Sequence, residues 1–210
     1  MSVIERLLRR EGEPTADSAV TIGPMRRRDL GRGVMDIEAV SYPRPWSRGV
    51  FESELAQVRS GDRFYVVARR HLAARGRGAG EQIVGYAGLW FTQDDAHVTN
   101  VAVLRAQQRT GVASRLLLSL ADEAIARGVD AWTLEVRASS TGAQELYRRF
   151  GFVPAGVRAR YYENTEDAIV MWCSDIRSAE YRATLDTIRT GLDARDAAAQ
   201  ARRGQAREEP

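Results

Sequence analysis

Apolar runs of strand length recur between residues 20 and 174, separated by stripes of apolar residues at helical spacing. The runs predict strands at 20–22, 63–69, 83–91, 96–103, 131–137, 152–162 and 167–172. The stripes predict helices at about 28–40, 48–57, 112–127 and 141–149. This mixed order, with a strand–helix–strand–helix unit in the middle, predicts an α+β domain whose sheet carries helices on both faces.

Capping and breaking residues support these boundaries. Two prolines before Ser47 exclude regular structure there, and Ser47 can cap the helix that follows. Gly128 and Gly151 each follow a predicted helix, at the position where glycine commonly ends one.

Three segments differ from this pattern. Residues 1–19 are charged, and we expect a flexible N-terminal arm before the domain at 20–174. Residues 71–82, rich in Gly, Ala and Arg, predict an exposed hairpin loop. Residues 175–210 predict a polar helix whose end frays after about residue 195. Its apolar stripe, which could contact the domain, a second copy or a partner, consists of Tyr181, Leu185, Ile188 and Leu192.

The composition is that of an ordinary soluble protein. Of the 210 residues, 44% are apolar and 28% charged, and no apolar run is long enough to span a bilayer. The first residues lack the apolar segment of a signal peptide, so we expect a cytoplasmic protein without membrane contact. A net charge of +3 fits a polyanionic cofactor but does not indicate nucleic acid. Cys173 is the only cysteine, which excludes an intrachain disulfide and a cysteine cluster for zinc.

The segment 101–117 is the strongest indication of function. It predicts the end of a strand, a polar loop and the start of an amphipathic helix. The first N–H groups of such a helix are unpaired and its dipole adds partial positive charge, so the junction can bind an anion. Taken alone, Gln108-x-x-Gly111-x-Ala113 is equally compatible with a basic turn whose arginines are solvated.

The loop motif resembles the pyrophosphate-binding loop of the GNAT superfamily of acetyl-CoA-dependent N-acetyltransferases. Further motifs closely resemble one GNAT family, the ribosomal-protein-alanine N-acetyltransferases of bacteria. They are Pro45-Trp46-Ser47, Leu134-Glu-Val-Arg-Ala-Ser-Ser140, Leu146-Tyr147-x-x-x-Gly151-Phe152 and Gly156-x-Arg158-x-x-Tyr161-Tyr162. The resemblance covers about Ile22 to Trp172 and implies the GNAT fold, with a mixed, mostly antiparallel central sheet.

The resemblance implies transfer of acetyl from acetyl-CoA to the N-terminal α-amine of a protein, with ribosomal protein S18 as the best candidate. The amine would attack directly in a ternary complex, and no metal is required. The implied cofactor-binding residues are Val101, Ala102, Val103, Arg109, Thr110, Gly111, Val112, Ala113, Ser114 and Ser140. Ser140 departs from the family, which usually has Asn there, and a hydroxyl reaches less far than an amide.

Glu135 and Tyr147 are the candidate proton-transfer residues. Glu135 alternates with apolar neighbours and could face solvent, although its strand is interior to the predicted order. Beside the thioester, its carboxylate could act as the general base for the amine. The helical spacing of Tyr147 alone predicts a core residue. The resemblance makes it the general acid for the departing thiolate. A phenol is a weaker acid than a thiol, so hydrogen bonding to the sulfur is the larger expected contribution.

Trp46, Tyr161 and Tyr162 are the candidate substrate-binding residues, because aromatic rings with a polar tip suit a peptide-binding wall. Cross-strand packing is an equal alternative for each tyrosine, and Trp46 could seal the core. His71 and His97 are isolated in the sequence and receive no role. Cys173 also receives none as an acyl carrier, because a buried, inert thiol is the default at a strand end.

Two other functions stay open. The same chemistry could act on a lysine side chain or a small-molecule amine. Alternatively, the chain could be a non-catalytic acyl-CoA-binding module that contacts partners through the stripe at 181–192, although the presence of Glu135 and Tyr147 argues against it.

Overall fold

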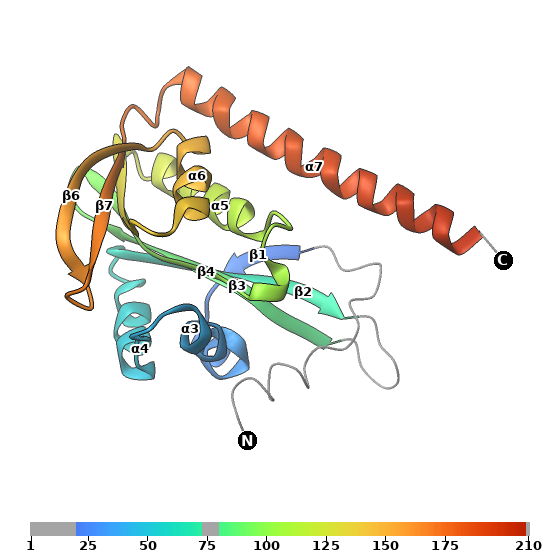
Figure 1. Ribbon diagram of the computed structural model, residues 1–210, viewed down its shortest axis with the longest axis horizontal. Coiled ribbons are helices and arrows are strands. Elements are labelled where there is room, and N and C mark those ends of the chain that lie inside the picture. Colours follow the sequence, from blue (N-terminus) through green and yellow to red (C-terminus); the bar gives the residue numbers. More distant parts are fainter. Residues whose placement is uncertain (1–19, 73–79, 209–210) are drawn as a thin grey trace.

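The computed structural model describes residues 20–72 and 80–208, in which a twisted sheet forms the centre of the molecule (Figure 1). Its strands are β1 (Val20–Pro24), β2 (Arg63–Leu72), β3 (Gly80–Phe91), β4 (Asp95–Val103), β5 (Ala131–Arg137), β6 (Val153–Tyr162) and β7 (Glu166–Cys173). They lie in the order β1-β2-β3-β4-β5-β7-β6. All neighbours are antiparallel except β4 and β5, which are parallel.

Helices cover both faces of this sheet. They are α2 (Arg27–Asp29), the π-helical turn η1 (Leu30–Val34), α3 (Met35–Ser41), α4 (Arg48–Gln57), the 3-10 turn η2 (Arg105–Gln107), α5 (Val112–Ala126), α6 (Thr141–Arg149) and α7 (Ala179–Glu208). In Figure 1, α3 and α4 lie below the sheet, whereas α5, α6 and α7 lie above it. The predicted α+β architecture is confirmed.

The observed strand bounds differ most from the predicted ones at the hairpin of β2 and β3. His71 pairs with Glu81 and Leu72 with Gly80, so both strands continue into the segment predicted as a loop. The rest of that segment, 73–79, and the predicted arm, 1–19, lie outside the described residues.

The helix predicted at 28–40 is interrupted by a kink between α2 and α3, where Gly33 has a non-helical backbone with a φ of 155°. Its apolar stripe is placed as predicted, because Leu30, Val34 and Ile37 are fully buried. The period of an apolar stripe does not reveal such a kink, because the buried positions on either side of Gly33 keep their helical spacing.

Helix α5 is anchored to the sheet by its apolar face. Leu116, Leu117 and Leu120 are fully buried, and the helix packs on β2, β3 and β4. Burying one such side chain contributes about 2 kcal/mol of free energy. The first turn of α5, and the loop before it, are therefore held on a rigid element.

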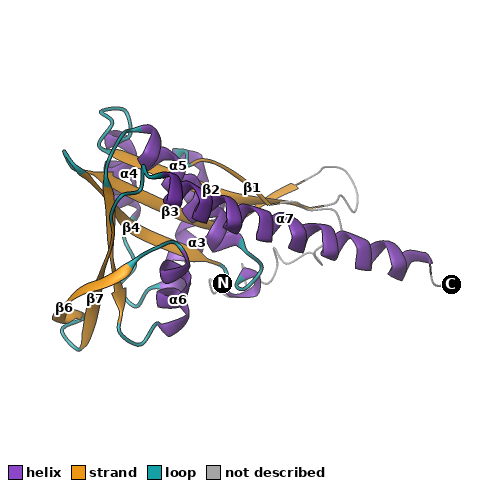
Figure 2. Cartoon of the chain, turned by 90° about the horizontal axis from the view of Figure 1, so that it is seen from above, coloured by secondary structure: helices purple, strands orange, loops and turns teal. Residues whose placement is uncertain are grey.

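The C-terminal helix α7 crosses the molecule above α5 and then extends past the domain (Figures 1 and 2). Its stripe packs on the core of this same chain, with Tyr181, Leu185 and Leu192 buried and Ile188 partly buried. The helix continues to Glu208, past the point near residue 195 where we expected fraying. Alanine, arginine and glutamine dominate this last stretch and are strong helix formers.

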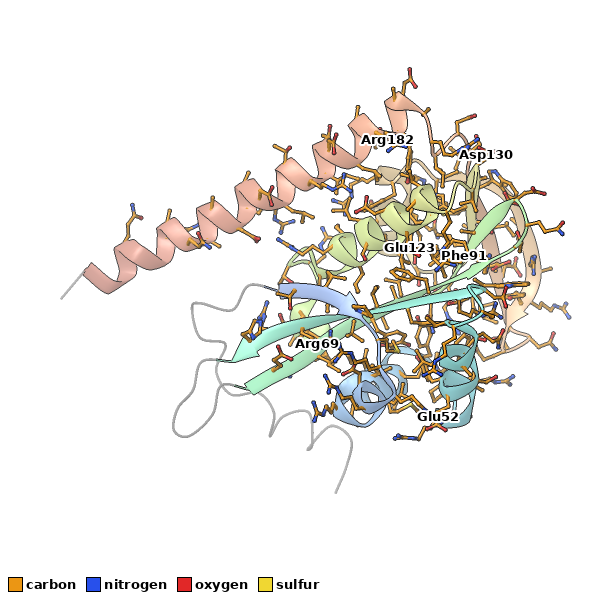
Figure 3. The ribbon with its side chains drawn as sticks, turned by 180° about the vertical axis from the view of Figure 1, so that it is seen from behind. Glu52, Arg69, Phe91, Glu123, Asp130 and Arg182 are labelled. Atoms are coloured by element: carbon orange, nitrogen blue, oxygen red, sulfur yellow. The ribbon has the colours of Figure 1, made fainter. Side chains whose placement is uncertain are left out.

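Ion pairs join segments that are distant in the sequence, and Figure 3 labels one partner of each of two such pairs, Asp130 and Arg69. Asp130, just before β5, accepts from Arg177 at 2.6 Å and ties the start of α7 to the sheet. On the opposite face, Arg69 of β2 pairs with the buried Asp29 of α2 at 2.7 Å. The Arg69–Asp29 pair is largely buried and holds α2 on β2, whereas the exposed Arg177–Asp130 pair contributes little stability.

Candidate active site

The sheet opens at its centre because β4 and β5 pair over only three residues. Asp95–His97 pair with Ala131–Thr133, whereas the rest of each strand is unpaired on this side. Polar backbone groups are consequently exposed along the opening. Side chains occupy some of them: the Val101 carbonyl accepts from Tyr42 Oη at 3.1 Å, and the Val103 carbonyl accepts from Gln108 Nε2 at 3.4 Å.

A cavity of about 1730 Å³ lies at this opening. Glu38 and Tyr42, at the end of α3, line it from one face of the sheet, and Ala143 and Tyr147 of α6 line it from the other. The predicted site residues in its wall are Trp46, Val101, Ala102, Val103, Glu135, Ser140, Tyr147, Tyr161 and Tyr162. The structure thus brings residues predicted for cofactor, proton transfer and substrate to one cavity.

The predicted phosphate loop follows directly after Gln108, which lines the cavity, but residues 109–114 are not among the lining residues. Gly111 is the N-cap of α5 and has a φ of 90°, in the left-handed region that favours glycine. Val112 and Ser114 are buried, so their backbone and not their side chains can face a ligand. Within the described residues, no N–H from Arg109 to Ser114 donates to a backbone acceptor. These free donors are the expected features of an anion site.

The C-terminal helix reaches the same loop, which the sequence did not predict. Arg195 Nη2 donates to the Arg109 carbonyl at 2.9 Å, and Asp196 pairs with Arg115 at 2.6 Å. Leu192 lies beside Gly111 of the loop and also belongs to the buried apolar core. Helix α7 therefore covers one side of the loop and places a carboxylate on one of its arginines.

Glu135 faces the cavity, and its side chain is only 10% exposed. Its Oε2 lies 3.0 Å from His97 Nε2, and its Oε1 lies 3.1 Å from Arg158 Nη2. The hydrogen bond from His97, with the charge of Arg158, holds the pKa of Glu135 below its ordinary value, although burial opposes this. Glu135 is therefore an anion at neutral pH and a weak base, and its surroundings do not strengthen its basicity.

Tyr147 is both a packing residue and part of the cavity wall. It is 9% exposed, and its ring packs edge-on against Phe152 at 5.8 Å between centroids. Burial raises its pKa above the ordinary value, so the phenol stays protonated. No described residue hydrogen-bonds to its hydroxyl, which remains available as a donor to a ligand.

Comparison with known proteins identifies the family. The profile of the acetyltransferase (GNAT) family matches residues 32–152, which include the loop, Glu135 and Tyr147. The chain belongs to the GNAT acetyltransferase family.

Two relatives and one solved structure are informative. The GNAT chain is 35% identical over 154 residues to the [ribosomal protein bS18]-alanine N-acetyltransferase of Escherichia coli (strain K12), covering 72% of this chain and 95% of that protein. It is 37% identical over 155 residues to N-alpha-acetyltransferase RimI of Mycobacterium tuberculosis, covering 70% and 88%. The crystal structure of the Escherichia coli ribosomal-protein-S18-alanine N-acetyltransferase superposes with a TM-score of 0.63 at 31% identity, covering 77% of this chain and 97% of that one.

This GNAT protein is therefore an acetyl-CoA-dependent N-acetyltransferase. Its residues fit that cofactor: the open edge of β4 can pair with an extended amide chain, and the unpaired N–H groups before α5 can bind phosphates. Among the described residues, no group of three His, Cys, Asp or Glu side chains could hold a metal ion. No described helix is both long and apolar enough to cross a membrane.

The predicted substrate residues, Trp46, Tyr161 and Tyr162, all line the GNAT cavity. Trp46 packs edge-on against Phe51 at 5.5 Å, and its backbone N–H donates to Glu38 Oε1 at 2.7 Å. Tyr161 is 49% exposed, whereas the Tyr162 hydroxyl donates to the backbone carbonyl of Glu135 at 3.1 Å. Tyr161 is thus half-exposed in the cavity wall, and Tyr162 is held at the opening of the sheet.

The turn between β6 and β7 is fixed by one arginine. Arg137 donates to Glu163 at 2.8 Å and to Glu166 at 2.9 Å, and its guanidinium lies 4.2 Å from the ring centroid of Tyr162. Glu166 also accepts from Ser139, and these bonds lower the pKa of Glu166 to about 2. The tyrosine pair is therefore positioned by a charged network on the GNAT domain.

Sequence reasoning missed two buried or central site residues, His97 and Glu38. Glu38 is 1% exposed and accepts from the Tyr86 hydroxyl as well as from Trp46, and burial raises its pKa. A signal existed for Glu38, because it follows Val34 by one helical turn within the apolar stripe. No such signal existed for His97, because the sequence of neither strand predicts the register in which β4 pairs with β5.

Proposed function

We propose that this acetyltransferase modifies the N-terminal α-amine of a protein, with ribosomal protein S18 as the first candidate substrate. The names of the Escherichia coli and Mycobacterium tuberculosis relatives, which describe N-terminal acetylation, support this substrate class. The α-amine attacks the acetyl thioester directly while both substrates are bound.

The weak basicity of Glu135 is the observation that favours an α-amine over a lysine as the substrate. His97 and Arg158 hold its carboxylate and keep its pKa low, so the site offers only a weak base. An α-amine has an ordinary pKa of about 8, and a lysine of about 10.4, a difference of roughly 3 kcal/mol in the free energy of deprotonation. A weak base suits the amine that deprotonates more easily. Glu135 accepts the amine proton, directly or through one water.

Tyr147 acts on the other side of the reaction. Its buried, protonated hydroxyl donates a hydrogen bond to the sulfur that leaves as the thiolate of coenzyme A. Such a donor, fixed before the reaction, stabilises charge that develops on the sulfur. It complements the removal of the amine proton by Glu135.

The remaining residues divide into cofactor and substrate groups. The strand Val101–Val103 pairs with the pantetheine arm, the backbone of residues 109–114 binds the pyrophosphate, and Ser140 lines the region between them. Trp46, Tyr161 and Tyr162 bind the peptide end. Residues 20–174 form the catalytic domain, and α7 is an accessory element beside the phosphate loop.

The test is acetylation of ribosomal protein S18 by the purified chain with acetyl-CoA, followed by tandem mass spectrometry. The expected product carries one acetyl group on the α-amine, and Glu135→Gln forms it at least about tenfold more slowly. Acetylation of S18 only at lysines would contradict the proposed site of transfer. Mass spectrometry of cellular protein N-termini, with and without this protein, then identifies the natural substrates.

A further inference from the structure

We propose that His97 positions the carboxylate of Glu135 for removal of the amine proton, a role that rests on the proposed function of Glu135. His97 lies on β4, opposite Thr133 of β5, at the last pair of residues before the two strands separate. It also lines the cavity, as Glu135 does. The imidazole therefore stands at the junction between paired sheet and open site.

Both ring nitrogens of His97 have partners. Nε2 lies 3.0 Å from Glu135 Oε2, and Nδ1 lies 2.8 Å from the hydroxyl oxygen of Thr133. A hydroxyl can donate or accept, so the Nδ1 contact is satisfied in the neutral and in the charged imidazole. In both forms Nε2–H can remain the donor to Glu135. The ring also packs edge-on against Trp90 at 6.5 Å, which fixes its plane.

Of the two residues that hold the Glu135 carboxylate, His97 is the more firmly placed. Arg158 comes from the edge strand β6, and its side chain is 55% exposed. His97 comes from a central strand, and its side chain is 26% exposed. A glutamate side chain has three torsions to fix, and the hydrogen bond from the less exposed, rigid imidazole restricts them more than one from a flexible, exposed arginine.

The arrangement leaves room for the reaction. With one bond to each oxygen, the Glu135 carboxylate retains accepting capacity for a water or for the amine. Holding an acceptor in one orientation before the reaction raises the rate of proton transfer without changing cofactor binding. The structure therefore predicts an effect of His97 on kcat and not on the KM for acetyl-CoA.

The experiment compares His97→Phe, which keeps a flat ring beside Trp90, with His97→Gln, whose amide N–H can replace Nε2–H. His71→Phe is the matched control, because His71 also lies near a glutamate (Glu81, 3.5 Å) but is 51% exposed at the far end of β2. We expect His97→Phe to lower kcat about tenfold, with the KM for acetyl-CoA within about twofold, and His97→Gln to restore most of the loss. His71→Phe should behave as wild type.

Coupling to Glu135 decides the interpretation. In a Glu135→Gln background, His97→Phe should lower kcat by less than about twofold, because the group it positions is gone. An equal tenfold loss in that background, or no rescue by His97→Gln, would overturn the positioning role. If His97→Phe keeps the wild-type kcat while Glu135→Gln is impaired, the positioning role of His97 is overturned and the proposed function of Glu135 stands. Wild-type kcat for Glu135→Gln would instead overturn the proposed function of Glu135.

Discussion

Gly111→Ala tests whether the turn before α5 binds the phosphates of acetyl-CoA. Gly111 has a φ of 90°, and a β-carbon there would come within 2.7 Å of Arg115 Nη1 and of Leu192 Cδ2. The Arg115 guanidinium can move away, whereas Leu192 is buried and must shift within its packing, which adds to the cost in stability. The backbone strain of a non-glycine residue remains, at about 1–2 kcal/mol.

This strain sets the expected loss of cofactor affinity. The loop can relieve it only by rotating out of the left-handed conformation, which turns the N–H groups of residues 109–114 away from the phosphates that we propose they bind. If the strain appears fully in binding, affinity for acetyl-CoA falls about 5- to 30-fold. Calorimetric titration with acetyl-CoA measures the loss, and a thermal melt measures stability.

Gly128→Ala is the matched control at the other end of α5. Gly128 has a φ of 78°, and nothing lies within 4 Å of the β-carbon that would be added. It should lower the melting temperature through a similar strain but leave the Kd for acetyl-CoA unchanged. An unchanged Kd for Gly111→Ala, or an equal loss for Gly128→Ala, would refute the assignment of the phosphate loop.

Three further outcomes are expected. Tyr147→Phe should lower kcat about tenfold or more with little change in the KM for acetyl-CoA or in melting temperature, because its hydroxyl bonds to no described residue; an unchanged kcat would exclude it from the mechanism. Leu185→Ala should destabilise the protein by about 2–5 kcal/mol, because Leu185 belongs to the apolar stripe of α7 and is only 1% exposed; a thermal melt that matches wild type would show that α7 is not docked. Cys173 is 4% exposed and burial raises its pKa, so the native protein should resist iodoacetamide at pH 8 and react after unfolding; fast native labelling would contradict this.

Local patterns were sufficient for much of the domain. The alternation around Glu135 and the stripe that contains Tyr147 placed both residues on the correct elements. The structure places Val101–Val103, Ser140, Trp46, Tyr161 and Tyr162 in the wall of one cavity with them, and their roles stay predictions. These features depend on residues close together in the sequence or on a motif.

Contacts between distant segments could not be predicted in the same way. The bond from His97 to Glu135 depends on the register of two parallel strands, which the packing of the whole sheet determines. The stripe of α7 predicted a helix but not the surface it covers, and Arg115 pairs with Asp196 across 81 positions of the chain. Such pairings need the folded arrangement, because neither partner carries a local signal.

The most direct test of the account is a pair of peptides with the same sequence and one internal lysine. One peptide has a free α-amine and the other has its α-amine blocked, and each is incubated with the purified chain and acetyl-CoA before tandem mass spectrometry. We predict acetylation of the first peptide at its N-terminus and none of the second. Acetylation of the blocked peptide at lysine, at a rate similar to that of the free peptide, would contradict the central claim.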